Sequence, residues 1–294
     1  MPRASHRPLV LPVVLLLIAM NSIQAGAALA KTLFHSVGAS GAVALRTALA
    51  TLILVIVLRP WRARITARSW RPLAAYGVSL GVMNFLYYLA LRTIPLGITV
   101  ALEFAGPLAV AVCSSRRPLD FLWILLAAAG LLLLLPLGRF GAPIDPIGAL
   151  FALGAGACWA LYIVYGQKAG ADHGAQAVAL GSIIACVIVV PLGVAQAGSA
   201  LLSPQALRYG LAIALLSTAL PYTLEMIVLT RLPARTFGIL MSIEPAFAAL
   251  FGWMMLGERL STPQWAAIVL IILASFGTTW SASAQRELAV PMPE

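Results

Sequence analysis

The sequence predicts an all-α polytopic membrane protein with ten transmembrane helices, arranged as two inverted repeats of five helices. Three observations carry this prediction. Apolar residues make up 62% of the 294-residue chain and charged residues only 10%, with a mean hydropathy of +0.99. The apolar residues gather in windows of about 20, the length that crosses a bilayer. Finally, Pro95 and Pro107 recur as Pro233 and Pro245 at one constant offset, close to half the chain.

Short segments with proline, glycine or charge separate the predicted helices. The apolar windows place the helices at residues 9–30, 37–58, 72–91, 96–114, 119–138, 146–166, 176–196, 205–229, 234–256 and 263–281. Three of them begin with a capping side chain before a proline, at Asp145, Ser203 and Thr262. The first run is longer than the core of a cleaved signal peptide, so we expect it to remain as a helix.

The basic residues predict the orientation. Segments predicted to face the cytoplasm hold thirteen of the nineteen Lys and Arg residues, and the outer segments hold five. The strongest anchor is the cluster from Arg59 to Arg71. We therefore expect both termini in the cytoplasm. The basic residues behind the net charge of +10 lie between apolar runs and form no basic face, which argues against nucleic-acid binding.

An odd number of helices in each half has a topological consequence. The second half enters the membrane from the opposite side, so the two units form an inverted repeat, as in many secondary transporters. We place the first unit at residues 1–138 and the second at residues 139–294.

Charged residues are the most costly side chains to bury in a membrane, and those inside predicted helices indicate the candidate site. Glu103 lies in the fourth predicted helix and Glu244 in the ninth, and Pro107 and Pro245 occupy matching positions. Each proline lacks an N–H group and so frees a carbonyl four residues earlier. Two interpretations stay open: a polar cavity lined by both helices, or a protonated glutamate bonded to a neighbouring helix with proline as a packing kink.

Other polar residues add to this picture. Glu225 is a third buried acid, and it could form a structural ion pair with Arg46 or share a substrate site with it. Lys31 and His35 are interpreted as interfacial residues that reach the surface. Hydrogen-bonding and aromatic residues that could line a cavity, or belong to the interfacial belt, are Asn21, Gln24, Asn84, Gln167, Tyr87, Tyr88, Trp159, Tyr162 and Tyr222.

Several enzyme and motor signatures are missing from the sequence. It contains no G-x-x-x-x-G-K-[ST], no H-E-x-x-H and no G-x-S-x-G. Its three cysteines show no C-x-x-C spacing, and its histidines lie outside the predicted helix cores. We expect no enzyme, no metal, no cofactor and no ATPase subunit.

Four stretches resemble one known family, and they span nearly the whole chain. They are Ala101–Val110, Gly154–Ala160, Leu216–Met226 and Arg231–Ala246. They resemble the EamA branch of the drug/metabolite transporter superfamily. Leu256–Leu260 also resembles the end of an EamA repeat, whereas residues 115–118 depart from that pattern.

This resemblance implies a proton-driven exporter in the bacterial inner membrane, carrying small neutral amino acids of the threonine and homoserine kind. Its partners would be the substrate, protons and the bilayer. The alternatives are export of another small metabolite or drug, a membrane-embedded enzyme, and a scaffold or sensor.

Residue roles follow from these expectations. Predicted substrate-binding residues are Glu103, Glu244, Arg46, Asn84, Tyr87, Trp159 and Tyr222. Predicted proton-coupling residues are Glu103, Glu244 and Glu225, and predicted helix kinks lie at Pro107 and Pro245. A zwitterionic amino acid needs an anionic partner for its ammonium group, which Glu103 or Glu244 could supply. Its carboxylate needs a donor, which Arg46 or a helix N-terminus could supply.

Overall fold

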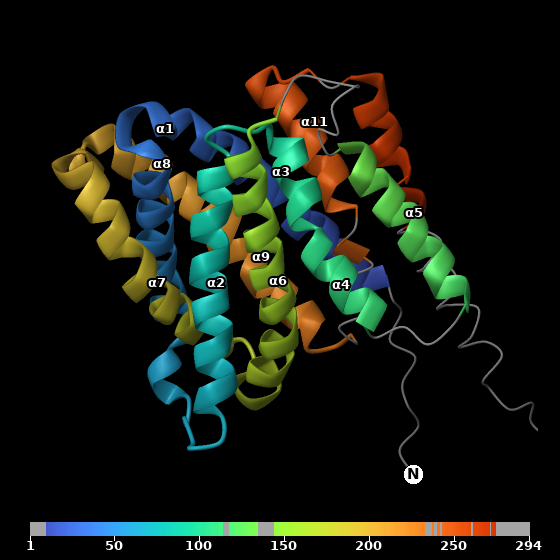
Figure 1. Ribbon diagram of the computed structural model, residues 1–294. Helices are drawn as coiled ribbons and strands as arrows, with labels where there is room; N and C mark the ends of the chain where they lie inside the picture. The colour runs from blue at the N-terminus through green and yellow to red at the C-terminus, as the bar shows by residue number, and fades with distance from the viewer. Residues whose placement is uncertain are drawn as a thin grey trace, which may run out of the picture.

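The structure is a computed structural model. It describes residues 10–113, 118–134, 144–232, 237, 240–241, 243–259, 261–270 and 272–274. Within these ranges the secondary structure is helical and includes no strand, which confirms the all-α prediction (Figure 1).

The helices of the first half are α1 (Val10–Leu58), α2 (Trp70–Ala90), α3 (Leu96–Glu103), α4 (Ala105–Cys113) and α5 (Pro118–Leu134). Those of the second half are α6 (Pro146–His173), α7 (Gln176–Ala197), α8 (Pro204–Ala214), α9 (Leu220–Leu229) and α11 (Glu244–Leu256). A last helix runs from Thr262 to Ala274. Short 3₁₀ turns lie at Pro60–Arg62 and Gly198–Leu202.

Helix α1 contains the first two predicted helices. Its backbone leaves helical geometry at Gly38, which adopts φ 71° and ψ 172°. Only glycine takes up such a conformation readily, because it has no Cβ. The predicted boundary between residues 30 and 37 is therefore a sharp bend at a glycine instead of a loop.

Two predicted helices are interrupted near their middle. The fourth divides at Phe104 into α3 and α4, and the ninth is interrupted at Ile243, where α11 begins. Pro107 and Pro245 each lie in the first turn of the new helix. A proline is tolerated there because the first-turn N–H groups have no partner within the helix. Each proline therefore lies one turn or less after an interruption, and the kinks expected at Pro107 and Pro245 stay predictions.

Two of the three predicted caps have the expected geometry. The Asp145 carboxylate accepts from the N–H groups of Ile147 and Gly148, and the Ser203 hydroxyl accepts from Ala206 N–H. Thr262 instead lies inside its helix. At that end the Gln264 side chain accepts from the N–H of Ser261 at 2.7 Å.

Helices from the two halves of the chain pack chiefly against one another. Helix α1 contacts α7, α8, α9 and α11, while α2 contacts α6 and α7. Helix α3 packs between α6 and α11, and α4 lies against α6 (Figure 1). The predicted boundary at residues 138–139 lies outside the described residues, so the division into two units remains a prediction.

The outer surface of the bundle suits a lipid environment. Five described segments are long and apolar enough to cross a membrane: Val10–Leu58, Trp70–Ala90, Pro146–His173, Gln176–Leu202 and Pro204–Leu229. Large apolar side chains such as Leu125, Leu150 and Val187 are more than 60% exposed. In a membrane, these side chains contact lipid tails.

Candidate functional site

A cavity lies between the two halves of the chain, and the charged residues that are costly to bury in a membrane surround it. The space among its lining residues measures about 420 Å³, which includes open solvent. Its lining residues are Ile23, Gln24, Arg46, Met83, Asn84, Tyr87, Val100, Glu103, Trp159, Tyr222, Glu225 and Glu244. The structure thus brings together, around one space, every residue predicted to bind substrate or couple protons. Gln24, considered as a cavity residue from the sequence, also lines it, as do Ile23, Met83 and Val100, which had been assigned no role.

Arg46 supplies the positive charge of the cavity. It is 3% exposed, and its Nη2 donates to Asn84 Oδ1 while its Nη1 donates to Ser217 Oγ at 3.3 Å. Its guanidinium carbon lies 4.9 Å from the centre of the Tyr88 ring. Its Nε–H has no partner within the described chain. Buried charges need such partners because burial removes their hydration.

Asn84 links Arg46 to the opposite wall. Its Oδ1 also accepts from the Tyr222 hydroxyl at 2.9 Å, and its Nδ2 donates to the Leu80 carbonyl at 2.7 Å. The amide is therefore fixed in one orientation, with the oxygen directed at both Arg46 and Tyr222.

Ser217 reaches Arg46 from a π-helical turn at Leu215–Ala219, which joins α8 to α9. Pro221 lacks the N–H that would bond the Ser217 carbonyl, so a wider turn is favoured here. The Ser22 hydroxyl donates to the neighbouring Leu216 carbonyl at 2.5 Å. Sequence reasoning missed Ser217, and the available signal was its position four residues before a proline in an apolar helix.

Three carboxyl groups face the cavity in different ways. Glu244 Oε1 accepts from Gln24 Nε2 at 2.9 Å, and its Oε2 has no partner among the described residues. Glu225 Oε2 accepts from the Tyr162 hydroxyl at 3.1 Å. Within the described ranges, no donor bonds to the Glu103 side chain, which at 8% is the most exposed of the three. Glu103 is thus the acid best placed to meet a ligand.

The structure corrects the suggested ion pair between Arg46 and Glu225. In the part of the chain that the structure describes, the recorded ion pair is Lys31–Glu258. Arg46 bonds neutral oxygens of Asn84 and Ser217, and Glu225 bonds a phenol. The cationic and anionic groups of the cavity therefore remain available to groups of opposite charge.

Aromatic side chains complete the wall. The Trp159 ring meets Phe104 edge-on, with 6.5 Å between ring centres. Tyr87 lies 5.9 Å from Tyr88, ring centre to ring centre, and its hydroxyl has no partner among the described residues. A buried tyrosine hydroxyl normally finds a partner, so this one can donate to a ligand.

The freed carbonyl of Glu103 does not face the cavity as the polar-cavity interpretation requires. A Cβ built on Gly156 of α6 would lie 2.5 Å from that carbonyl oxygen. The carbonyl therefore packs against the bare Cα of Gly156, which lets the end of α3 approach α6 closely, while α4 approaches α6 through Gly106. The Met241 carbonyl adjoins undescribed residues, and no contact can be assigned to it.

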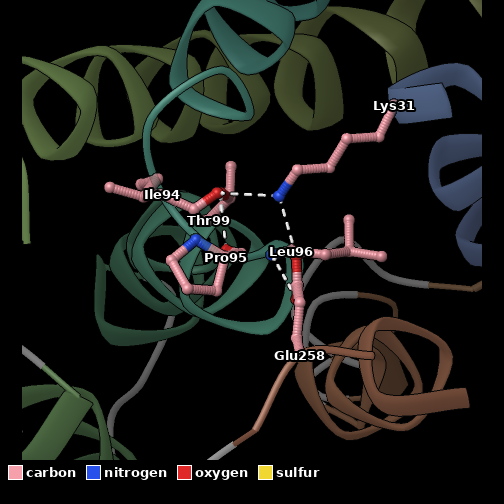
Figure 2. A network of polar contacts seen from close by, with 6 residues as sticks. All are labelled: Lys31, Ile94, Pro95, Leu96, Thr99 and Glu258. Atoms are coloured by element: carbon pink, nitrogen blue, oxygen red, sulfur yellow. Dashed lines mark hydrogen bonds and ion pairs between the residues drawn. The ribbon is translucent and has the colours of Figure 1, made fainter. Parts of the chain in front are cut away.

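Lys31 is not a surface residue of the expected kind. Its Nζ donates to Glu258 Oε1 at 2.7 Å and to the Ile94 carbonyl oxygen at 3.4 Å (Figure 2). His35, one turn later, is exposed. Sequence reasoning recognised Glu258 only as part of the stretch ending a repeat and gave it no partner.

Comparisons with known proteins agree with this architecture. The family model described as "EamA-like transporter family" matches residues 146–280. A Salmonella typhimurium (strain SL1344) protein named threonine/homoserine exporter RhtA is 59% identical over 95% of each chain. The chain belongs to the EamA-like transporter family. The RhtA protein of Escherichia coli (strain K12) is also 59% identical to this EamA-like chain, over 92% of each.

More distant relatives extend the family's range. The uncharacterized transporter YwfM of Bacillus subtilis (strain 168) is 31% identical to this EamA-like chain, over 70% of it and 72% of the relative. A solved structure described as "Crystal structure of protein" superposes with a TM-score of 0.70 at 19% identity. It covers 94% of this chain and 99% of that one, and it supports the fold alone.

Family membership confirms several expectations. The resemblance drawn from the four stretches is correct, and the chain is a multi-pass membrane transporter and not an enzyme. What the cavity residues bind remains a proposal.

Proposed function

We propose that this EamA-like protein exports small neutral amino acids, of the threonine and homoserine kind, across the bacterial inner membrane. The observation that carries the proposal is a single cavity with a guanidinium group at one wall and carboxyl groups at the others. The named activity of relatives that are 59% identical supports the same substrate class. Export of another small metabolite or drug is the alternative.

The cavity chemistry suits a zwitterion. The substrate carboxylate would accept from Arg46, whose Nε–H has no partner in the described chain, and from the Tyr87 hydroxyl. The substrate ammonium would bond to Glu103, with Glu244 as its second partner. Asn84 and Tyr222 hold the Arg46 side of the site in place. Trp159 would close the site over the apolar part of the substrate.

Proton coupling is proposed for the three acids Glu103, Glu225 and Glu244. A carboxyl group in the cavity can hold a proton when the site is empty and release it when an ammonium group arrives. Such an exchange links substrate loading to proton movement, because the same oxygen serves both. Rocking of the two inverted units, residues 1–138 and 139–294, would then expose the site alternately to each side.

The proposed orientation places both termini in the cytoplasm. It rests on the positive-inside distribution, and the exposed arginines from Arg59 to Arg71 form its strongest anchor. In this orientation the two units enter the membrane from opposite sides.

The direct test is counterflow in proteoliposomes. Vesicles loaded with unlabelled threonine should accumulate labelled threonine, and homoserine should compete. A panel of neutral, acidic and basic amino acids would define the range, and an imposed pH gradient would test coupling. Absence of counterflow with every neutral amino acid would overturn the proposal and favour another metabolite.

A further inference from the structure

The two halves of the chain meet in a polar cluster outside the cavity. It consists of Lys31 at the end of the first membrane crossing, the backbone of Ile94 and Leu96, and Glu258 (Figure 2). Across the described ranges, Lys31–Glu258 is the recorded ion pair, at 2.7 Å. The two side chains are 24% and 14% exposed, so water reaches this cluster.

Glu258 uses both carboxylate oxygens in this cluster. Oε1 accepts from Lys31, and Oε2 accepts from the N–H of Leu96 at 2.9 Å. Leu96 is the first residue of α3, and Pro95 before it offers no side-chain cap. A carboxylate from the second half of the chain therefore caps a helix of the first half, where the helix dipole favours negative charge.

The cluster lies over one end of the cavity. Lys31 follows Gln24 by seven residues on α1, and Leu96 precedes Glu103 by seven residues on α3. At 1.5 Å per residue, both helices run about 10 Å from the cavity to the cluster. Two helices that line the cavity thus converge on one carboxylate that follows α11.

Both helices that reach this cluster have a break in their helical geometry nearby. Helix α3 ends at the interruption at Phe104, beyond which α4 packs closely on α6. Helix α1 bends at Gly38, seven residues after Lys31. The Lys31 and Glu258 side chains are partly hydrated, so separating them exposes charges to water and not to lipid, although Ile94 and Leu96 beside them are buried. Separation elsewhere along the halves would expose buried apolar surface.

We propose that Lys31 and Glu258 form a gate at this end of the transport pathway, closed in the present structure. The inference rests on the proposed transport function and adds residues that control access without contacting the substrate. In the predicted orientation, this end faces away from the cytoplasm. Opening the gate breaks the ion pair and uncaps α3 in one step, because both depend on Glu258.

Access to the cavity can be measured without any substrate. Ile23 would be replaced by cysteine as a reporter, in the full chain with Cys113, Cys158 and Cys186 changed to serine. A membrane-impermeant maleimide would then be applied to right-side-out and to inverted vesicles. Lys31→Gln and Glu258→Gln should each increase labelling from one side about fivefold, because both lose the partly exposed ion pair and Glu258→Gln also loses the charged cap of α3.

Two further variants separate a gate from a structural contact. Arg259→Gln alters the exposed neighbouring charge and should leave labelling at the starting level. The exchange K31E/E258K restores the ion pair but not the cap on Leu96, so labelling should fall most of the way back. Unchanged labelling in both single variants, even with lower thermal stability, would overturn the gate.

The result is independent of the substrate assignment. If the labelling increases but no neutral amino acid shows counterflow, the gate stands and the substrate proposal fails. If counterflow succeeds and the labelling is unchanged, the substrate proposal stands and the gate fails.

Discussion

Arg46 and Glu103 are charged cavity residues that have no counter-ion among the described residues. Arg46 is held by neutral oxygens, and Glu103 carries no hydrogen bond from the described chain. Leaving charges uncompensated costs stability in a buried site. A ligand carrying both charges would offset that cost on binding, so these residues are where substrate affinity should be most sensitive.

We expect Glu103→Gln to lower threonine transport at least tenfold, because the ammonium group loses its anionic partner. Residual transport should respond less to pH than the unaltered protein does. Initial rates of efflux from proteoliposomes at several pH values measure both effects. Asp172→Asn changes an exposed acid at the end of α6 and serves as the control. Fully pH-sensitive transport in the Glu103 variant would remove Glu103 from coupling.

Replacing Arg46 tests the cationic side of the cavity. Arg46→Gln should weaken threonine binding about 10- to 100-fold, the effect of losing hydrogen bonds to a charged group. Arg46→Lys keeps the charge but cannot bridge Asn84 and Ser217 together, so binding should remain impaired. Titration of the purified protein with threonine measures the affinities. Wild-type affinity in the Lys variant would show that only the charge matters.

Among the secondary-structure elements, the interruptions within helices are the features that lie nearest the cavity residues. Breaks at Phe104 and Ile243 each precede a proline in the first turn of the next helix, and a π turn precedes α9. Glu103 and Glu244 lie beside the two breaks and line the cavity, and the π turn carries Ser217, which contacts Arg46. Broken helices also occur at the binding sites of many transporters. The helices between them are positioned by close contacts such as α4 on α6.

The contact between the end of α3 and α6 depends on Gly156. Gly156→Val should force the two helices apart, because even a Cβ would lie 2.5 Å from the Glu103 carbonyl oxygen. We expect a lower thermal unfolding temperature and a loss of transport. Gly154→Val on the same helix is the matched control, since its Cβ would meet only a flexible Leu86 methyl at 3.1 Å. Equal stability of both variants would contradict this account.

The cap of α6 makes a pH-dependent contribution. A hydrogen bond from Thr93, followed by backbone N–H groups of Gly148 and Ile147, holds the pKa of Asp145 below its ordinary value. The charged carboxylate is therefore favoured by folding, and its stabilisation is present above that ordinary pKa of about 4 and is lost as pH falls below it. Melting of the detergent-solubilised protein should show a constant deficit for Asp145→Ala from pH 8 to 5. The deficit should shrink below about pH 4; a deficit independent of pH would exclude the carboxylate.

At the scale of the whole molecule, the cavity belongs to neither half alone. Gln24, Arg46 and Glu103 come from the first half of the chain, and Glu225 and Glu244 come from the second. The helices of the two halves form the walls together, so a relative movement of the halves changes the cavity.

The predicted orientation can be tested on the intact chain. A fluorescent protein fused to the C-terminus should fluoresce, whereas a phosphatase that folds only outside the cytoplasm should be inactive there. The same reporters placed after Arg92, in the short segment between α2 and α3, should give the opposite pattern. Matching signals at both positions would contradict an arrangement with both termini inside.

The sequence by itself determined the class of the molecule. Hydropathy windows and short polar connections identify membrane helices because lipid leaves the backbone no alternative. Isolated charges such as Glu103 and Arg46 identify the candidate site because each is too costly to keep without a role or partner. Family-like stretches then pointed to a transporter. None of these signals depends on which residues are in contact in the folded protein.

Only the tertiary structure decided the pairings. An ion pair of Arg46 with Glu225 was one of two interpretations, but Arg46 bonds Asn84 and Ser217; Lys31 was expected at the surface but bonds Glu258. The partners are distant in sequence and lie on different helices, so helical periodicity cannot relate them. Helix packing, set by small residues such as Gly156 and by breaks such as Gly38, determines which polar groups meet.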